Sequence, residues 1–196
     1  DQTITAKRFV VATGSSPWIP EIKGLDTVDY VTNEEIFKLE KLPEHLMILG
    51  AGPVGVEMAQ AFVRFGSRVT LIEKAERILP GSDSDISKTL MQVFSDEGIE
   101  IATDKTVVAV ESVDTEIKVI MQDGSTVSGD ALLVAIGRRP VVDSMGLEKA
   151  GVEYSQRGVK VNTKMQTTNR YIYACGDVTG LMPLTHVAEQ QAGVVI

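Results

Sequence analysis

The stretch ILGAGPVGVE, residues 48–57, sets three glycines between an apolar run and a segment with helical periodicity. Gly50 permits a sharp bend after a strand, and Gly52 lets a backbone approach a ligand with no Cβ in the way. Gly55 allows the following helix to pack closely on that strand. The spacing therefore predicts a strand, a tight glycine turn and a helix, the arrangement that receives the pyrophosphate of a dinucleotide.

The neighbouring segments extend this turn into a β-α-β unit. Residues 46–50 form an apolar run typical of a buried strand, and residues 53–65 carry apolar side chains at helical spacing. Residues 68–73 are rich in β-branched side chains, which favours a second strand. This strand ends at Glu73, about 20 residues after the turn, where nucleotide-binding β-α-β units place an acid that binds the ribose.

The remaining segments predict an α/β chain. We expect strands at 5–12, 99–102, 106–113, 116–122, 131–136 and 171–174, a short helix at 33–39 capped by Asn33, and a helix from the 82–85 caps to Glu97. Asp123-Gly124 indicates a hairpin turn, so a β-meander replaces the usual crossover helix before 131–136. The predicted fold class is a Rossmann-type parallel sheet with helices on both faces and a β-meander crossover.

The choice of nucleotide depends on the charges around position 73. A carboxylate there accepts hydrogen bonds from both ribose hydroxyls of NAD and repels the 2′-phosphate of NADP. Lys74 and Arg77 favour the opposite choice, because basic residues after this strand can hold that phosphate. Glu73 ends the strand itself and is the closer group, so the sequence favours NAD.

The charge balance limits the classes of partner. The chain has 19 basic and 27 acidic residues, for a net charge of −8. Nucleic acids and anionic membranes are bound through clustered basic residues, so neither is expected as a partner. The sequence shows no membrane-length apolar run and no signal-peptide pattern, and its one cysteine, Cys175, offers no disulfide framework. We therefore expect a cytoplasmic protein, and, because residue 1 is not Met, one cut from a longer chain.

Four stretches together resemble the FAD-dependent pyridine nucleotide–disulfide oxidoreductases, and their lipoamide dehydrogenase members most of all. They are VVATGSSP (10–17), GAGPVGVE (50–57) with IEK (72–74), AIGRRP (135–140), and YACGDV (173–178) followed by PLTHVAE (183–189). They follow the family's order and span nearly the whole chain. The resemblance implies an NAD-binding domain at 16–137, flanked by partial FAD-domain segments at 1–15 and 138–196.

The resemblance also implies cofactor contacts for individual residues. Contacts to NAD are implied for Gly50, Ala51, Gly52, Pro53, Val54, Gly55, Glu57, Glu73, Lys74, Val107, Gly137 and Arg138. Contacts to FAD are implied for Thr13, Gly14, Ser15, Asp177, Pro183, Leu184, Thr185 and His186. Glu57 would lie near the nicotinamide, Asp177 at the ribityl or phosphate region of FAD, and residues 183–186 beside the isoalloxazine ring. No residue is assigned a catalytic or metal-binding role.

Several parts of the family's chemistry are missing from these 196 residues. The sequence has no second G-x-G-x-x-G, no cysteine pair and no histidine that matches the family's catalytic position. A dithiol–disulfide step needs two cysteines, so we expect this chain alone to be inactive and to hold only part of the FAD site. The strands expected at 9–12 and 171–174 would lack sheet neighbours, because the resemblance places those neighbours in the missing part.

The resemblance leaves the substrate of the full enzyme open. A full-length member would pass hydride between NAD and FAD and is expected to be a homodimer, whereas the oligomeric state of this chain stays undetermined. Lipoamide is the first expectation for the substrate, with glutathione-type disulfides and mercuric ion as alternatives. A non-catalytic NAD(H)-binding module is the remaining alternative.

Overall fold

The computed structural model describes residues 3–195; residues 1–2 and 196, at the outer ends of the predicted segments 1–15 and 138–196, lie outside that part of the chain. The chain forms two compact units, one of residues 17–137 and one of residues 1–16 with 138–196. Within residues 3–195, no helix is long and apolar enough to cross a membrane.

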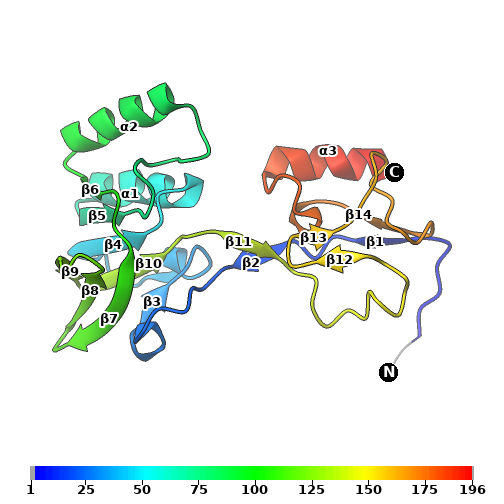
Figure 1. Ribbon diagram of the computed structural model, residues 1–196, viewed down its shortest axis with the longest axis horizontal. Coiled ribbons are helices and arrows are strands. Elements are labelled where there is room, and N and C mark those ends of the chain that lie inside the picture. Colours follow the sequence, from blue (N-terminus) through cyan, green and yellow to red (C-terminus); the bar gives the residue numbers. More distant parts are fainter. Residues whose placement is uncertain (1–2, 196) are drawn as a thin grey trace. The chain divides into compact units, whose positions relative to one another are not determined.

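A parallel five-stranded sheet forms the centre of the 17–137 unit (Figure 1). Its strands, in spatial order, are β3 (Tyr30–Val31), β10 (Ala131–Val134), β4 (His45–Leu49), β5 (Arg68–Ile72) and β6 (Glu100–Ala102). Every neighbouring pair is parallel. The inner strands β4 and β10 are mostly buried, as their apolar sequences require when both faces of a sheet are covered. The predicted Rossmann-type parallel sheet is confirmed.

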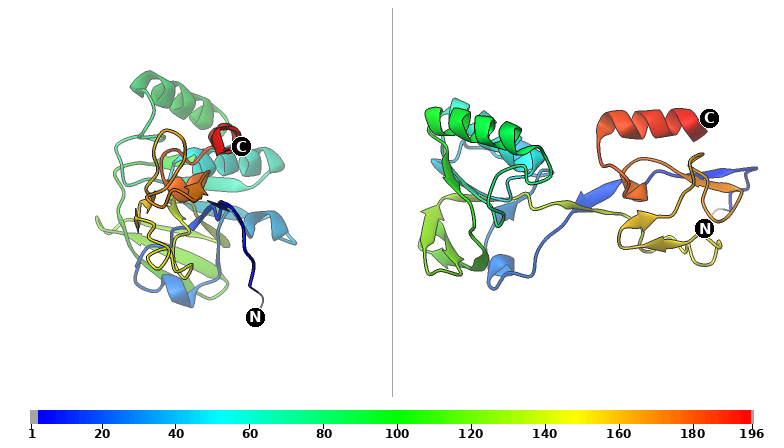
Figure 2. Two further views of the ribbon diagram at one scale, coloured as in Figure 1. Left: turned by 90° about the vertical axis from the view of Figure 1, so that its right-hand side faces the viewer. Right: turned by 45° about the horizontal axis from the view of Figure 1, so that its top comes forward.

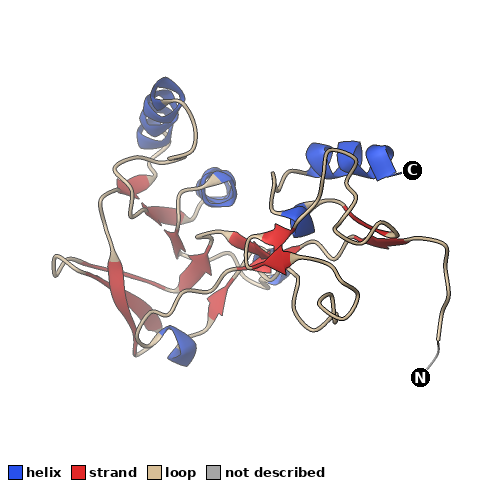
Figure 3. Cartoon of the chain, turned by 45° about the vertical axis from the view of Figure 1, so that its right-hand side comes forward, coloured by secondary structure: helices blue, strands red, loops and turns tan. Residues whose placement is uncertain are grey.

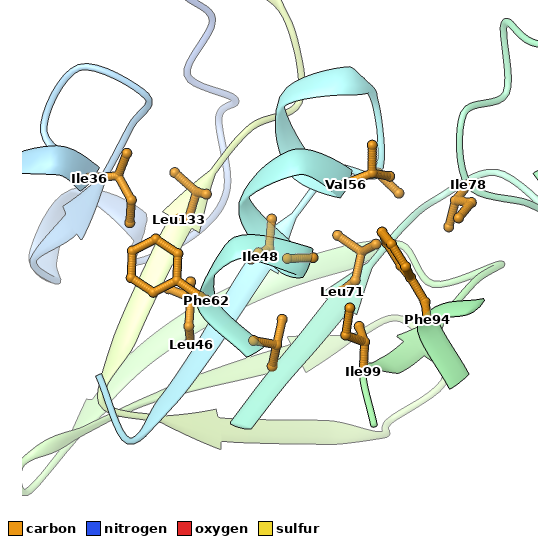
Figure 4. Close-up of a cluster of buried hydrophobic side chains, with 13 residues drawn as sticks. Ile36, Leu46, Ile48, Val56, Phe62, Leu71, Ile78, Phe94, Ile99 and Leu133 are labelled. Carbon is orange, nitrogen blue, oxygen red and sulfur yellow. The ribbon is translucent and has the colours of Figure 1, made fainter. Parts of the chain in front are cut away.

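Both long helices of this unit pack on the same face of the sheet. These helices, α1 (Pro53–Phe65) and α2 (Ser84–Asp96), agree with the helical periodicity of the sequence. Gly66 ends α1 in the left-handed conformation, with φ 107°. Figure 4 shows the apolar cluster between the helices and the sheet, which includes Ile36, Leu46, Ile48, Val56, Phe62, Leu71, Phe94 and Ile99.

An antiparallel meander covers the opposite face, as Figure 2 shows for the 17–137 unit. It consists of β7 (Val107–Val113), β8 (Glu116–Met121) and β9 (Thr126–Gly129), and the predicted Asp123-Gly124 turn joins the last two. Its inward side chains and those of the sheet form a second apolar cluster, which includes Met47, Leu49, Val110, Ile117, Val119, Met121, Leu132 and Val134. The predicted meander crossover is therefore confirmed.

The placement of the helices differs from the expectation of helices on both faces. On the meander face, the only helical element in the apolar cluster is the 3-10 turn η1 (Leu25–Thr27), among the residues that the structure describes. The connections from β4 to β5 and from β5 to β6 progress in one direction across the sheet, whereas the connection from β6 returns to β10. Because crossovers between parallel strands are right-handed, reversing the direction moves the connection to the other face.

The short helix expected to start at Asn33 is only a 3-10 turn, η2 (Ile36–Lys38). Hydrogen bonds from and to Thr32, one residue before the expected cap Asn33, precede this turn. Thr32 Oγ1 accepts a hydrogen bond from the Glu34 N–H at 3.2 Å, while Glu35 Oε2 accepts from the Thr32 N–H at 3.1 Å. This is the pattern of a capping box, and the sequence Thr-x-x-Glu at 32–35 carried its signal.

The unit of residues 1–16 and 138–196 consists of short strands and one longer helix (Figure 3). Its elements are β1 (Phe9–Val11), β2 (Ser15–Pro17), β11 (Arg138–Pro140), β12 (Tyr154–Ser155), β13 (Gly158–Val159), β14 (Ile172–Ala174), η3 (Asp177–Thr179) and α3 (Thr185–Val195). Strand β2 pairs with β11, and β12 with β13. A small core contains Val142, Leu147, Val152, Val159, Ala174 and Val178.

Strands β1 and β14 pair with each other in parallel, from Phe9 opposite Ile172 to Val11 opposite Ala174. The expectation that both strands lack sheet neighbours is therefore wrong. The strand expected at 5–12 begins only at Phe9, because the ladder with β14 is three residues long. Phe9 and Val10 remain 47% and 50% exposed, so this two-stranded sheet still leaves apolar surface uncovered.

Candidate functional site

The glycine turn follows β4 at the carboxyl edge of the parallel sheet. Gly50 has φ 99°, and its N–H donates to the Ile72 carbonyl at 2.8 Å. A Cβ on Gly50 would lie 2.6 Å from the Ala135 carbonyl oxygen, so the turn packs directly against the loop that follows β10. The connection that leaves β4 crosses the helix face of the sheet, and the meander connection that enters β10 crosses the other face, so their shared carboxyl edge is the point of reversed strand order where open α/β sheets bind ligands.

The other two glycines face different surroundings. A Cβ on Gly55 would lie 1.9 Å from the Gly50 carbonyl oxygen, so this glycine allows α1 to pack on the turn. A Cβ on Gly52 would meet no protein atom within 4 Å. Gly52 is the N-cap of α1 and Pro53 its first residue, where the missing N–H of proline costs nothing. The first N–H groups of α1 and the positive end of its dipole thus border space that an anionic ligand can occupy.

Glu73 is tied into this turn by both of its carboxylate oxygens. Oε2 accepts a hydrogen bond from the Ala51 N–H at 2.7 Å, and Oε1 accepts one from the Ala75 N–H at 2.8 Å. Each oxygen of an ionised carboxylate has two acceptor positions, so each retains one for a further donor. The carboxylate is therefore held in place beside the glycine turn with acceptor capacity to spare.

The two basic residues that opposed the NAD assignment are placed differently. Arg77 Nη2 donates to the carbonyl oxygens of Pro80 at 3.3 Å and Ser82 at 3.2 Å, which ties the guanidinium to its own loop. Lys74 is exposed beside Glu73. The hydrogen bonds of Arg77 within its own loop were not predicted from the sequence.

Three further residues of the predicted NAD set, Glu57, Val107 and Gly137, belong to the same unit as the glycine turn. Glu57 is exposed on the second turn of α1, and its side chain makes no hydrogen bond or ion pair with any residue of 3–195. Val107 begins β7 and is half-buried. Gly137 has φ 142° and borders open space, while its carbonyl accepts the Trp18 N–H at 3.0 Å.

Arg138, from the predicted NAD set, lies in the other unit, where it shares one hydrogen-bond network with part of the predicted FAD set. Arg138 Nε donates to Ser15 Oγ at 2.7 Å, and the Ser15 hydroxyl donates to Asp177 Oδ2 at 2.6 Å. Because the guanidinium can only donate, the single hydroxyl hydrogen of Ser15 must point at the carboxylate. Arg138 Nη2 also donates to the Ser15 carbonyl at 2.7 Å, which fixes the backbone of this strand.

Neighbouring contacts hold the turns that carry Ser15 and Asp177. Thr13 Oγ1 donates to the Val141 carbonyl at 2.7 Å, and the Val141 N–H donates to the Gly14 carbonyl at 3.0 Å. The Gly176 N–H donates to Oε1 of Gln191, a buried residue of α3, at 2.8 Å. Sequence reasoning did not find Gln191 and had no motif with which to find it.

The last predicted FAD residues, Pro183, Leu184, Thr185 and His186, are exposed in the loop before α3 and in its first turn. The structure gives no hydrogen bond between their side chains and the Ser15–Asp177 pair. Cys175 is buried, and this burial raises the pKa of its thiol. Within residues 3–195, no group of three or more His, Cys, Asp or Glu residues is arranged to hold a metal ion.

One charged pair near the NAD set was missed by sequence reasoning. Lys105 Nζ and Asp123 Oδ2 form an ion pair, and the Lys105 N–H donates to the Glu73 carbonyl at 3.0 Å. The Asp-Gly pattern identified the turn that contains Asp123 but carried no information on where its carboxylate points.

Comparison with known proteins places the chain in a wider group. A family model described as pyridine nucleotide-disulphide oxidoreductase matches residues 1–192. A mercuric reductase of Bacillus cereus is 39% identical, over 97% of this chain and 31% of its own length. A dihydrolipoyl dehydrogenase of Bacillus subtilis is 36% identical, over 93% and 40% respectively.

The solved structures agree with the sequence comparison. The HOCl-induced flavoprotein disulfide reductase RclA of Escherichia coli superposes with a TM-score of 0.93 at 32% identity, over 98% of this chain and 44% of that chain. This chain therefore spans less than half the length of each of these three relatives.

Proposed function

This chain belongs to the pyridine nucleotide–disulphide oxidoreductase family, whose members use FAD and NAD(P), and we propose that residues 16–137 are its NAD(H)-binding domain. Residues 1–15 and 138–196 are, in the same proposal, segments of its FAD domain. The observation that carries the proposal is the open space at Gly52, where a Cβ would meet no protein atom although the turn is closely packed on either side of it. In a G-x-G-x-x-G turn that opens a helix after a buried strand, such a glycine is accounted for by a ligand that approaches its backbone.

The residues of the turn fit a dinucleotide. The N-terminus of α1 offers N–H groups and a positive dipole end to the pyrophosphate. Glu73, held by the Ala51 and Ala75 N–H groups, offers its remaining acceptor positions to the two ribose hydroxyls. Gly137, across the switch point, leaves room for the nicotinamide half. When both cofactors are bound, they supply the hydride transfer of the full enzyme, while the residues of this chain bind and orient them.

We propose NADH rather than NADPH as the ligand. A 2′-phosphate would stand against the Glu73 carboxylate, and of the two basic residues on this strand's loop, Arg77 is tied to the Pro80 and Ser82 carbonyls while only Lys74 is exposed beside Glu73. Charge-assisted hydrogen bonds to Glu73 are worth about 1.5–3 kcal/mol each, so the affinity for NADH should exceed that for NADPH at least about tenfold.

Titration of the chain with both nucleotides tests this assignment. Glu73→Gln removes the charge at nearly constant shape and should narrow the difference between NADH and NADPH. Glu76→Ala, which alters an exposed acid three residues away, is the matched control and should leave the difference unchanged. Equal or tighter binding of NADPH to the unaltered chain would refute the assignment.

For the other half of the reaction, we propose that Thr13, Gly14, Ser15 and Asp177 contact FAD in the full protein. Asp177 fits a ribityl hydroxyl, because the Ser15 hydroxyl occupies Oδ2 and Oδ1 remains available as an acceptor. Pro183, Leu184, Thr185 and His186 are exposed in a position that the resemblance gives to the isoalloxazine ring. A free-standing NAD(H) sensor, the non-catalytic alternative, would have no use for this network.

The isolated chain should be colourless and inactive in this proposal. It lacks a second glycine-rich pyrophosphate loop, and contacts to the ribityl and ring portions alone do not offset the ordering cost of binding FAD. Absorbance at flavin wavelengths after desalting, and disulfide reduction with NADH, measure both expectations. A stoichiometric yellow flavin or a measurable turnover would contradict them.

The acceptor of the full enzyme is proposed to be a lipoamide-type disulfide, with mercuric ion and glutathione-type disulfides as alternatives. The mercuric reductase and the dihydrolipoyl dehydrogenase, at 39% and 36% identity, resemble this chain to nearly the same degree. We also propose a reducing, cytoplasmic setting, because Cys175 has no second cysteine within the 196 residues.

A further inference from the structure

A lysine lies directly beside the strand end that carries Glu73. The loop after β6 runs alongside the loop after β5: the Glu73 N–H donates to the Ala102 carbonyl at 2.9 Å, and the Lys105 N–H donates to the Glu73 carbonyl at 3.0 Å. Both loops leave the carboxyl edge of the sheet, where the nucleotide is proposed to bind. Lys105 is thus a cation in the neighbourhood of the adenosine ribose, and its side chain is only 30% exposed.

The meander brings an acid to this lysine. The β8–β9 turn is attached to the start of β7, because the Gln122 N–H donates to the Thr106 carbonyl at 2.8 Å. Asp123, in that turn, pairs through Oδ2 with Lys105 Nζ. Its other oxygen accepts the Ser125 N–H at 3.0 Å and the Ser125 hydroxyl at 2.5 Å, which sets the direction of the carboxylate.

We infer that Asp123 is a specificity-determining residue of the proposed NAD(H) site, because it neutralises Lys105 and so withholds one of the cations that could accept the 2′-phosphate of NADPH. The inference rests on the proposed function. In it, the meander does more than cover the second face of the sheet: its hairpin tip carries a charge to the nucleotide edge. Glu73 then disfavours the phosphate by repulsion, and Asp123 disfavours it by pairing with Lys105, a second lysine near Glu73 besides the exposed Lys74.

The charges of the pair support this role. The ion pair and the Ser125 hydrogen bonds hold the pKa of Asp123 far below its usual range, so its carboxylate stays ionised at every pH at which the chain would be assayed. Replacing Asp123 by Asn removes this charge, while the amide oxygen can still accept from Ser125. Lys105 then keeps an uncompensated positive charge near the proposed ribose site. This charge attracts the 2′-phosphate of NADPH more strongly than the 2′-hydroxyl of NADH.

Affinity measurements for NADH and NADPH on the 196-residue chain test the inference. Asp123→Asn should raise the affinity for NADPH relative to NADH about threefold in dilute buffer, the scale expected for a partly exposed charge pair. The gain should disappear at about 1 M salt, where the Debye length is about 3 Å. Lys105→Met alone should shift the ratio the other way, toward NADH, because it leaves the Asp123 carboxylate uncompensated. Lys105→Met combined with Asp123→Asn should abolish the gain.

Asp114→Asn is the matched control. Asp114 lies in the β7–β8 turn, at the other end of the same meander, and is exposed with φ 53°, a conformation that asparagine adopts readily. This variant makes the same change of net charge and should not alter the ratio.

The outcomes separate the inference from the proposed function. Suppose that the unaltered chain binds NADH, so that the NAD(H) site stands. The role of Asp123 is then refuted if Asp123→Asn changes the NADPH-to-NADH affinity ratio no more than Asp114→Asn does. It is also refuted if the gain in NADPH affinity persists when Lys105→Met is added. If the unaltered chain binds neither nucleotide, the proposed function fails and the inference fails with it.

Discussion

Alanine at Gly52 and at Gly55 should differ in its effect on stability, although the two glycines are three residues apart in one turn. A Cβ on Gly55 would lie 1.9 Å from the Gly50 carbonyl oxygen, and Cβ atoms do not approach other atoms within 3.0 Å, so turn and helix must separate by about 1.1 Å. Overpacking of this kind costs about 1–3 kcal/mol. Gly55→Ala should therefore lower the free energy of unfolding by that amount and also weaken NADH binding.

Gly52→Ala should affect binding alone. Its Cβ meets no protein atom within 4 Å, and the backbone at φ −75° suits alanine. An N-cap alanine costs about 0.5–1 kcal/mol, and the reduced freedom of the unfolded chain returns about 0.4–1 kcal/mol, so the free energy of unfolding should change by less than about 0.5 kcal/mol. The methyl group occupies the space proposed for the pyrophosphate, so NADH affinity should fall at least about tenfold.

Urea unfolding followed by the fluorescence of Trp18, the chain's one tryptophan, measures stability in the 17–137 unit. Calorimetric titration with NADH measures binding. Gly193→Ala, in α3, is the control: its Cβ also meets nothing within 4 Å, and it should leave NADH affinity unchanged. A Gly52→Ala variant that binds NADH as tightly as the unaltered chain would refute the reasoning that the open space belongs to a ligand.

Two further predictions concern polar groups outside the glycine turn. Burial of the imidazole, and next the positive charge of Arg68, lowers the pKa of His45 below its usual value of 6.5. Below that pH the unfolded state binds more protons than the folded state, so the stability of the 17–137 unit should fall as the pH drops below about 6.5. His45→Asn should flatten this dependence in urea unfolding at pH 5, 6 and 7, and an unchanged slope would contradict the assignment. Ser15→Ala removes the hydroxyl that accepts from Arg138 Nε and donates to Asp177 Oδ2, and it should lower the free energy of unfolding of the 1–16/138–196 unit by about 1–3 kcal/mol, with recovery in Ser15→Thr. Faster hydrogen exchange at 172–178 would report the loss, and exchange equal to that of the unaltered chain would exclude it.

The parts of the fold that depend on local pattern could be predicted from the sequence. The glycine spacing, the β-branched run before Glu73 and the Gly66 stop each have a local cause, and α1 and β5 lie at the expected residues, to within one position. The meander was predictable for the same reason, because helical periodicity ends after residue 102 and Asp123-Gly124 marks a hairpin.

The parts that depend on contacts distant in sequence could not be predicted. The pairing of β1 with β14 joins segments more than 150 residues apart, and no local pattern specifies such a partner. The face on which α2 lies follows from strand order, which the sequence analysis did not derive. At the site, Glu73 was found by its spacing, whereas its bonds to Ala51 and Ala75, and the pairing of Lys105 with Asp123, follow from how loops meet at the sheet edge.

Hydrogen exchange of the chain with and without saturating NADH tests the central claim most directly, because it locates the ligand. Binding at the proposed site should slow exchange at the backbone amides of residues 50–57, at the Glu73–Ala75 loop and at residues 135–137, and should leave residues 172–186 unchanged. Protection confined to residues 172–186, or no protection anywhere at a concentration that saturates binding, would contradict the assignment of the 17–137 unit as the NAD(H)-binding domain.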